Sequence, residues 1–279
     1  MLVQQTTFKP FCPKLENYGR SVHQAFVDAK IDGEYGVWFR NGIYNKNGKE
    51  RRDFNASEFC KLLAAHLLEM TQVPFETLQI QGELHYNGGI AGDLYKLLSH
   101  KEDDNLNFTV FDWSATGSLL NHNFLDRREI LLRAYRKAFE GRNKFETDKL
   151  RIVPFDFCES KGEIHDSFNK FVSEGYEGVV VRPTLWNTGF KWKSRDTADL
   201  KVLSADKWKE RIGLENPNNP GTELCGCKIN KSYDVRVAMV GLIVEIEYLQ
   251  KLHNDKGVLT GLRNPSFVRM RDDKKEASL

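Results

Sequence analysis

Apolar side chains recur at helical spacing in three segments of the chain. The first segment begins after Asn55, a residue suited to cap a helix, and stops before Pro74. The second stops at Gly141 and the third at Gly175, and glycine there suits the left-handed conformation that ends many helices. We therefore predict three amphipathic helices, whose apolar faces are formed by Phe59, Leu62, Leu63, Leu67 and Met70 with His66, by Leu131, Leu132, Tyr135, Ala138 and Phe139, and by Ile164, Phe168, Phe171 and Val172.

Strand-like segments lie between these helices and dominate the last part of the chain. The segment 34–45 carries the hairpin signal Asn41–Gly42, and further strands are predicted at 77–86, 107–113 and 179–181. After about residue 200 no helix is predicted, and short strands separated by Gly, Pro and Asn turns are expected near 200–205, 232–240, 242–250 and 266–271. About eighty residues of short strands indicate a small closed barrel, of which the OB-fold is the common nucleic-acid-binding form. We predict an α+β chain with a mixed domain at 1–197 and an OB-fold domain at 198–279.

Composition narrows the class of protein. The 279 residues are 40% hydrophobic and 29% charged, and the mean hydropathy is −0.53. No apolar run approaches the roughly 20 residues that span a bilayer, and the opening MLVQQTTFKP does not have the pattern of a secretory signal. Five cysteines, an odd number in a long chain, fit a reducing compartment. We therefore expect a cytoplasmic monomer with no membrane partner (in the host cytoplasm, for a viral enzyme).

The net charge and the cysteines indicate no particular polyanion or metal site by themselves. The net charge is +2, so a polyanion would have to be bound by local clusters of basic residues. One stretch is rich in them, and it is either a solvated surface or a set of phosphate contacts: Arg182, Lys191, Lys193, Arg195, Lys201, Lys207, Lys209 and Arg211. Cys225 and Cys227 form a lone C-x-C without the four ligands that structural zinc needs, so we interpret them as strand or core residues.

Several short motifs carry chemistry when they are taken together. Lys30 lies at a predicted strand end in DAKIDG, where burial and nearby cations favour the neutral, nucleophilic amine. Each motif taken alone fits an ordinary turn, core or surface position. In chain order the motifs are Lys30-x-Asp32-Gly33, Glu83 in QGEL, Phe111–Asp112 in TVFDW, Glu177–Gly178 in EGVVVRP, Lys191 and Lys193 in GFKWK, and the closing LRNPSFVRMRDDK.

This ordered series resembles the covalent nucleotidyltransferases, the superfamily of DNA ligases, RNA ligases and mRNA capping enzymes. The resemblance runs from about residue 28 to residue 274. It implies an adenylyltransferase domain of antiparallel sheets and helices followed by an OB-fold barrel. The closing LIVEIEYLQ and LRNPSFVRMRDDK look most like a DNA ligase, of a minimal form similar to viral or phage enzymes. The implied activity is ATP-dependent sealing of nicks in double-stranded DNA, as in replication, repair and recombination, with ATP as AMP donor and magnesium as metal.

The resemblance also implies a role for each motif residue. Lys30 would carry AMP, Asp28 would accept a hydrogen bond from the adenine amino group, and Glu83 would bind the ribose hydroxyls. Phe111 would stack on adenine. The remaining roles concern phosphates and metal, with Glu177 and Asp32 as magnesium ligands, Lys191 and Lys193 on the α-phosphate, and Arg271 and Lys274 on the leaving pyrophosphate.

Two positions depart from the family pattern. DNA ligases usually have arginine five residues after the nucleophilic lysine, where this chain has Tyr35. Their next motif is usually Ser-Arg-x-Gly, whereas this chain has Asn45-Lys46-Asn47-Gly48. Lys46 is therefore the candidate for the 5′-phosphate of the nick, although it lacks the bidentate fork of arginine, and Arg40 is a second candidate.

Three functions stay open at this point. The first is a DNA ligase and the second is an RNA ligase or capping-type transferase. The third is a non-catalytic nucleic-acid-binding module based on the barrel, which would not need the combination of Lys30, Glu83 and Glu177 with Lys191 and Lys193.

Overall fold

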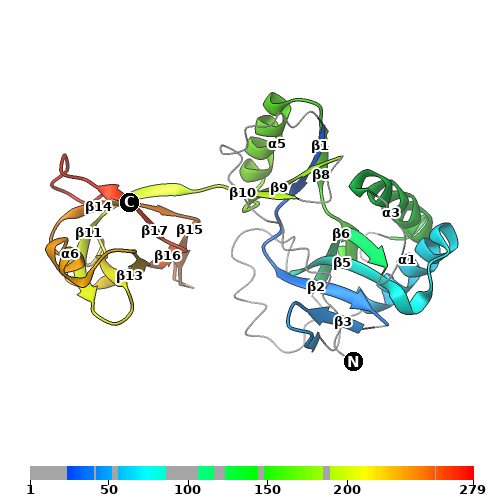
Figure 1. Cartoon of the computed structure of the whole chain (residues 1–279), viewed down its shortest axis with the longest axis horizontal. Helices are drawn as coiled ribbons and strands as arrows, with labels where there is room; N and C mark the ends of the chain where they lie inside the picture. The colour runs from blue at the N-terminus through cyan, green and yellow to red at the C-terminus, as the bar shows by residue number, and fades with distance from the viewer. Residues whose placement is uncertain are drawn as a thin grey trace. The chain divides into compact units, whose positions relative to one another are not determined.

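The two parts of the chain form separate compact units. A computed structural model describes residues 24–40, 42–51, 56–85, 106–115, 123–143, 148–184, 189–254 and 256–279. The units are Met1–Lys193 and Ser194–Leu279, and many of their elements are labelled in Figure 1. The break comes before the predicted boundary at 197/198, because Asp196–Asp206 (β11) is one continuous strand. Ala198, Asp199 and Leu200 are all buried in this strand, so the predicted boundary falls inside an element of the barrel.

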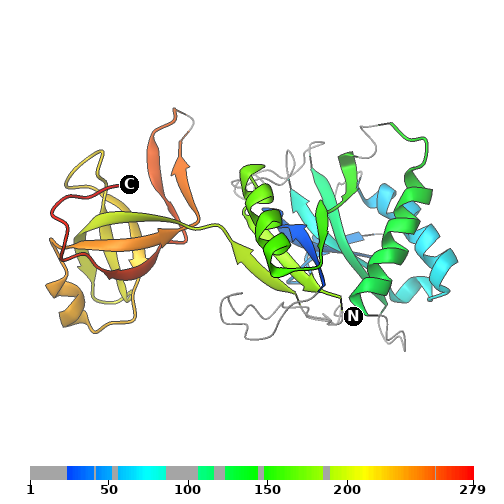
Figure 2. The same cartoon turned by 90° about the horizontal axis from the view of Figure 1, so that it is seen from above.

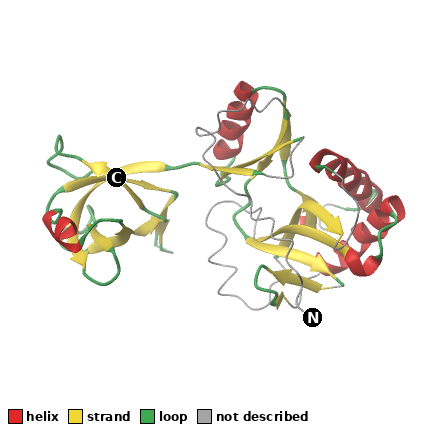
Figure 3. Ribbon diagram, viewed as in Figure 1, coloured by secondary structure: helices red, strands yellow, loops and turns green. Residues whose placement is uncertain are grey.

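The larger sheet of the first unit is covered by two helices. Its described strands have the order β4-β3-β2-β5-β6-β7, and neighbours are antiparallel except β6 and β7. The helices α1 and α3 pack on each other and on one side of this sheet, as Figure 3 shows. The bounds are β2 (Glu34–Phe39), β3 (Gly42–Asn45), β4 (Glu50–Arg51), β5 (Leu78–His85), β6 (Asn107–Ala115), β7 (Leu150–Ile152), α1 (Ala56–Thr71) and α3 (Phe124–Phe139), with a 3-10 turn at Phe75–Thr77.

A smaller sheet completes the first unit. Its described strands have the order β10-β9-β1-β8, all antiparallel, and α5 packs against β1, β8 and β9. Figure 2 shows α5 lying along this sheet. The bounds are β1 (Ala25–Ala29), β8 (Phe155–Cys158), β9 (Gly178–Pro183), β10 (Phe190–Lys193) and α5 (Lys161–Ser173). Residues of β1 and β9 form a core with α5, separate from the core under α1 and α3.

The three predicted helices are confirmed, and their apolar faces are the buried ones. Leu63 and Leu67 of α1 are fully buried. Gly141 and Gly175 follow α3 and α5 with φ of +73° and +93°, so these helices end as the sequence predicts. The predicted cap Asn55 lies outside the described residues. The hairpin at 34–45 is also present, with Phe39 paired to Gly42, and Asn41 likewise lies outside the described residues.

The second unit is a closed barrel with the order β11-β12-β13-β17-β14. Its bounds are β11 (Asp196–Asp206), β12 (Arg211–Glu215), β13 (Glu223–Lys228), β14 (Ile243–Tyr248) and β17 (Ser266–Met270), and β15 (Gln250–His253) and β16 (Leu259–Arg263) form a separate hairpin. Inward-facing aliphatic residues of the barrel form one core. The predicted α+β class, with mainly antiparallel sheets and helices followed by a small OB-type barrel, is confirmed.

One predicted strand is wrong. The segment 232–240 contains α6 (Tyr233–Ala238) instead of a strand. Ser232 caps this helix, because its hydroxyl accepts a hydrogen bond from the Val235 amide at 3.4 Å. The alternating valines misled the prediction, since Val235 and Val237 are each 45% exposed whereas Arg236 between them is buried. Elsewhere, no helix among the described residues has the length and apolar character needed to cross a bilayer.

Candidate active site

Lys30 lies directly after the central strand β1 of the smaller sheet. Its amide donates to the carbonyl of Gly178 at 2.8 Å, which fixes the chain between β1 and β9. The turn after it passes against β5, where a Cβ on Gly33 would lie 2.2 Å from the Leu84 carbonyl oxygen. Only glycine fits this approach, which explains the glycine at position 33. Asp32 is buried within the same turn.

A buried carboxylate joins two of the predicted lysines. The Lys30 amine is ion-paired with Oε2 of Glu177, and Lys193 Nζ lies 2.6 Å from Oε1 of the same carboxylate. Glu177 is 3% exposed at its side chain. Burial by itself would raise the pKa of Glu177, but the charges and hydrogen bonds of Lys30 and Lys193 outweigh burial and hold the pKa below its usual value.

The approach of β10 to β9 explains how Lys193 reaches Glu177. Lys193 pairs with Gly178 across these strands. A Cβ on Gly178 would lie 2.1 Å from the Trp192 carbonyl oxygen, so glycine lets the two backbones come close. Lys191 lies two residues earlier on the same face of β10 and is exposed.

Glu83 brings the larger sheet to the same cluster. Its Oε2 atom is buried and has no hydrogen-bond partner among the described residues. Burial raises the pKa of Glu83 to about 7, while the nearby charges of Lys30 and Lys191 lower it and those of Asp32 and Glu177 raise it. A buried carboxylate oxygen without a partner is costly. This oxygen is therefore suited to accept a hydrogen bond from a bound hydroxyl.

The raised pKa of Glu83 predicts how stability changes with pH. The folded chain holds the proton of the Glu83 carboxyl more tightly than the unfolded chain does. The stabilisation that results is fully present below pH 4.5 and is lost as pH rises through about 7. Relative to Glu83→Gln, the unfolding free energy of the wild type should fall by up to about 3 kcal/mol between pH 4.5 and 8. Denaturant unfolding at several pH values measures this difference.

Glu177→Gln provides the control of opposite sign. The lowered pKa of Glu177 contributes stability that is present above about pH 4.5 and is lost as pH falls through the folded-state pKa. If the unfolding free energies of the wild type and Glu83→Gln changed equally with pH, this would contradict a pKa of Glu83 that burial raises.

Asp28 and Phe111 have partners that the sequence did not predict. Asp28 is buried, and it accepts hydrogen bonds from Arg128 at 2.5 Å and from Arg182 at 2.8 Å. The guanidinium of Arg182 also lies over the Phe111 ring, 5.0 Å from its centre. Both carboxylate oxygens of Asp28 therefore have arginine partners, and its adenine contact stays a prediction. Helical spacing places Arg128 on the buried face of α3 with Phe124, but this spacing does not indicate Asp28 as its partner.

Tyr35 lies next to Glu83 and Phe111 on the larger sheet. It pairs with Glu83 between β2 and β5, and its ring centre is 6.2 Å from that of Phe111. Its hydroxyl donates a long hydrogen bond of 3.4 Å to Gln81. Burial, with smaller effects from the Glu83 and Asp112 carboxylates, raises the pKa of this phenol. The residue that replaces the usual arginine is therefore a neutral ring at the edge of the cluster.

The two candidates for the 5′-phosphate lie in exposed turns. Lys46 is in the turn after β3, which is held by Asn45, whose side chain accepts from the amides of Asn47 and Lys49. Arg40 is in the β2–β3 turn with φ of +48°, and it lies over the Phe39 ring. Both roles stay predictions.

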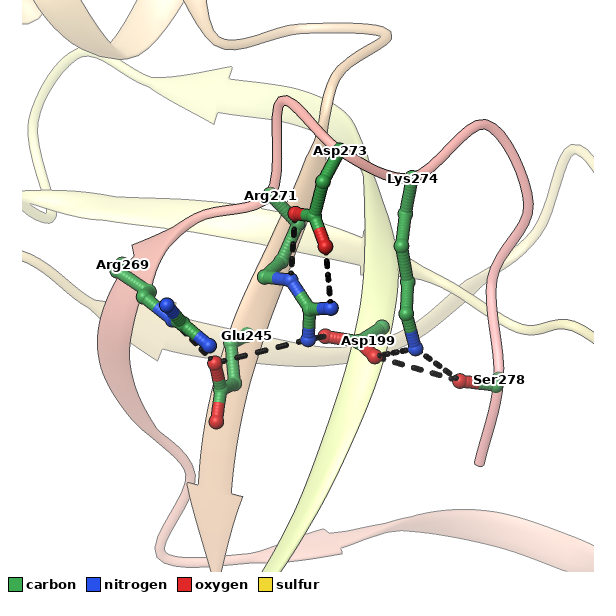
Figure 4. Close-up of polar contacts among 7 residues, drawn as sticks. All are labelled: Asp199, Glu245, Arg269, Arg271, Asp273, Lys274 and Ser278. Carbon is green, nitrogen blue, oxygen red and sulfur yellow. Dashed lines mark hydrogen bonds and ion pairs between the residues drawn. The ribbon is translucent and has the colours of Figure 1, made fainter.

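Arg271 and Lys274 lie in the second unit, after β17, and share one carboxylate. Arg271 Nη1 lies 2.9 Å from Oδ1 of Asp199, and the Lys274 amine is ion-paired with Oδ2 (Figure 4). Asp273 accepts two further hydrogen bonds from Arg271, at 2.8 and 2.7 Å. Both cations that were predicted to bind pyrophosphate are therefore ion-paired within their own unit.

The predicted basic stretch from Arg182 to Arg211 is not one solvated set of charges. Arg182 is buried against Asp28. Three others have carboxylate partners at 3.7 Å, namely Arg195 with Glu247, Lys201 with Glu215, and Arg211 with Asp206. Lys207 and Lys209 remain exposed on the β11–β12 turn, on either side of Trp208, which is 84% exposed.

Metal ligands are few in the described part of the chain. No group of three or more His, Cys, Asp or Glu side chains there is arranged to hold a metal ion. Magnesium commonly binds through one or two carboxylates together with water and phosphate oxygens. Glu177 and the buried Asp32 fit that smaller requirement, and a metal would compete with the lysines for Glu177.

Comparisons with known proteins give the fold. No protein-family model matches the sequence, and no curated protein matches it. Among solved structures, Pmar-Lig_PreS3 is 18% identical, with a TM-score of 0.66 over 89% of this chain and 64% of that one. A Lig E DNA ligase, from a study of DNA binding with a minimal scaffold, is 17% identical, with a TM-score of 0.66 over 93% of this chain and 97% of that one. The chain thus spans less than two thirds of Pmar-Lig_PreS3 and nearly all of the Lig E protein, and it shares their fold.

Proposed function

We propose that the chain is an ATP-dependent DNA ligase that seals a nick between a 3′-hydroxyl and a 5′-phosphate. The observation that carries this proposal is the pairing of Lys30 and Lys193 with the buried carboxylate of Glu177. A nucleophilic lysine, a second cation and a metal-binding carboxylate are the groups that nucleotidyl transfer to an amine requires. The shared fold with a Lig E DNA ligase supports DNA as the substrate. On this proposal, the first unit is the adenylyltransferase domain and the second is the OB-fold domain.

The first step would join AMP to Lys30. The neutral amine attacks the α-phosphorus of ATP, a P–N bond forms, the bond to the bridging oxygen breaks, and pyrophosphate leaves with that oxygen. The Lys30 ammonium must lose one proton to water before it attacks, which ends its ion pair with Glu177, and the nitrogen loses a second proton to water as the P–N bond forms. Lys191 and Lys193 would neutralise the α-phosphate as negative charge develops. The free oxygen of Glu83 would accept from a ribose hydroxyl, and Phe111 would contact the base.

Two further steps would complete sealing. AMP passes from Lys30 to the 5′-phosphate of the nick, which breaks the P–N bond and forms a pyrophosphate linkage. The 3′-hydroxyl then attacks that 5′-phosphate, a phosphodiester forms, and AMP leaves. Lys46 is the candidate for positioning the 5′-phosphate.

Glu177, with Asp32, would hold magnesium against the phosphates. Glu177→Ala should therefore lower the sealing rate about 10²- to 10³-fold, as loss of a main electrostatic contributor does. The exposed Glu174→Ala, a carboxylate at the end of α5, is the matched control and should seal normally. Single-turnover sealing over a magnesium titration measures both variants. Sealing by Glu177→Ala at near-normal rate and low magnesium would rule out this role.

Two exposed cations of the basic stretch, Lys207 and Lys209, are proposed as DNA contacts. If each contacts one phosphate, Lys207→Ala with Lys209→Ala should weaken nick binding and reduce the log–log salt slope by about 0.9 per contact. Lys61→Ala with Lys137→Ala, a pair of exposed lysines on α1 and α3, serves as the control. Fluorescence anisotropy at several salt concentrations measures the slopes. An unchanged slope in the first pair would identify this turn as a solvated surface.

An RNA ligase or capping-type transferase is the alternative, because these enzymes share the same lysine chemistry. Matched nicks in DNA and RNA, each tested with ATP and with GTP, separate the candidates. A DNA ligase seals the DNA nick with ATP. Sealing of only the RNA nick would favour an RNA ligase, and labelling of the protein by GTP alone would favour a capping-type enzyme.

A further inference from the structure

Asp199 joins the two cations that follow β17. It is 6% exposed in β11, and each of its carboxylate oxygens faces a different cation, Arg271 at Oδ1 and Lys274 at Oδ2 (Figure 4). The backbone also holds this arrangement, because Asp199 and Ser278 exchange two amide hydrogen bonds at 2.8 and 2.7 Å. The segment that carries Lys274 is thus bound to β11 through both its backbone and its side chain.

The donors of these cations are largely occupied. Arg271 uses Nε and Nη2 for Asp273 and Nη1 for Asp199, and its side chain is 15% exposed. The Lys274 amine contacts Asp199 and lies 3.4 Å from the Ser278 hydroxyl. Asp273 is exposed and can swing away with Arg271, whereas Asp199 is fixed in a strand. A phosphate can bind the full set of donors only after they leave Asp199.

We propose that Asp199 is a positioning residue that competes with pyrophosphate for Arg271 and Lys274. This inference rests on the proposed function, in which those two cations act on the pyrophosphate of ATP. In the free protein, the Asp199 carboxylate holds the two cations together, and its charge and that of Asp273 balance theirs. When the phosphates of ATP arrive, they take the place of Asp199. Asp199 itself contacts no reacting atom.

The test compares Asp199→Asn with the wild type, using the full chain. The amide keeps the shape of the side chain and removes its charge, so the cations should be released more easily. Pyrophosphate binding, measured by calorimetry, should tighten about three- to tenfold, the range expected for loss of two partly exposed ion pairs. In self-adenylylation, KM for ATP should fall by the same factor while kcat changes less than about twofold. Asp199→Glu, which keeps the negative charge, should have the pyrophosphate affinity and the KM for ATP of the wild type.

Glu245→Gln is the matched control for net charge. Glu245 lies 2.6 Å from Arg269 and 3.7 Å from Arg271. The substitution Glu245→Gln therefore removes one negative charge from the edge of the same cluster. It should change pyrophosphate affinity much less than Asp199→Asn does. An equal change in both variants would mean that net charge alone acts and would overturn the proposal. Unchanged or weaker pyrophosphate binding by Asp199→Asn would overturn it as well.

Two further measurements keep the proposal testable. If Asp199→Asn does not fold, the guanidinium NMR signals of Arg271 in the wild type, assigned with Arg271→Ala, should move on adding pyrophosphate and not on adding chloride at equal ionic strength. If pyrophosphate does not move the Arg271 signals, the proposal that it competes with Asp199 is overturned. A wild-type chain that forms no AMP adduct would refute the proposed function, whereas adduct formation with an indifferent Asp199→Asn would refute only the role of Asp199.

Discussion

Lys30→Ala should abolish attachment of AMP to the protein, because the proposed first step forms its P–N bond on the Lys30 amine, which lies at Oε2 of Glu177. Alanine also removes one of the two cations on Glu177 but leaves Lys193 at 2.6 Å, so the fold should persist. The variant should still bind nicked DNA. Intact mass under denaturing conditions, after incubation with ATP and magnesium, measures the adduct.

The matched control is Lys170→Ala. Lys170 is also an ion-paired lysine of the first unit, 2.8 Å from Asp156, but it is exposed and lies on α5. It should form the adduct at the wild-type rate. An adduct on Lys30→Ala would place the nucleophile elsewhere in the chain.

Arg271→Ala with Lys274→Ala should separate the first step from the last. Without these cations the pyrophosphate has less stabilisation as it leaves, and self-adenylylation should fall by about 10³-fold or more, since each cation contributes about as much as one electrostatic group. The same variant should seal a nick whose 5′-phosphate already carries AMP at close to the wild-type rate, because no pyrophosphate leaves in that step. The first rate is measured as formation of the AMP adduct from ATP, and the second as single-turnover sealing of the pre-adenylated nick.

Arg269→Ala with Lys275→Ala removes the same charge from exposed neighbours and should leave both rates nearly unchanged. Lys30→Ala should retain some sealing of the pre-adenylated nick. Glu177→Ala should lose both self-adenylylation and sealing of the pre-adenylated nick. If the Arg271 and Lys274 double variant is equally defective on the pre-adenylated nick, these residues are not specific to the first step.

The sequence predicted the parts of the fold that depend on local pattern. The helices ending at Gly141 and Gly175 are present, because apolar spacing and a left-handed glycine are both local signals. The prediction failed at 232–240, where Val235 and Val237 alternate as in a strand although a capped helix forms and exposes both. Strands β12 and β13 were missed because their glycines and charges resemble turns.

The candidate site was predicted as a set of motifs but not as a network. Lys30, Glu177 and Lys193 lie together as the resemblance implies. The partners of Asp28 could not be predicted, since Arg128 and Arg182 lie 100 and 154 residues away in sequence. Asp199 was missed for the same reason, since its cationic partners Arg271 and Lys274 lie 72 and 75 residues away in sequence.

The most direct test of the account follows AMP from the protein to DNA in one experiment. The chain is first incubated with ATP and magnesium, freed of nucleotide, and then mixed with DNA that carries a single nick with a 5′-phosphate. We expect an AMP adduct on Lys30 that disappears as sealed strand forms, and that persists when the nick lacks its 5′-phosphate. Absence of the adduct, or an adduct that never passes to nicked DNA, would contradict it.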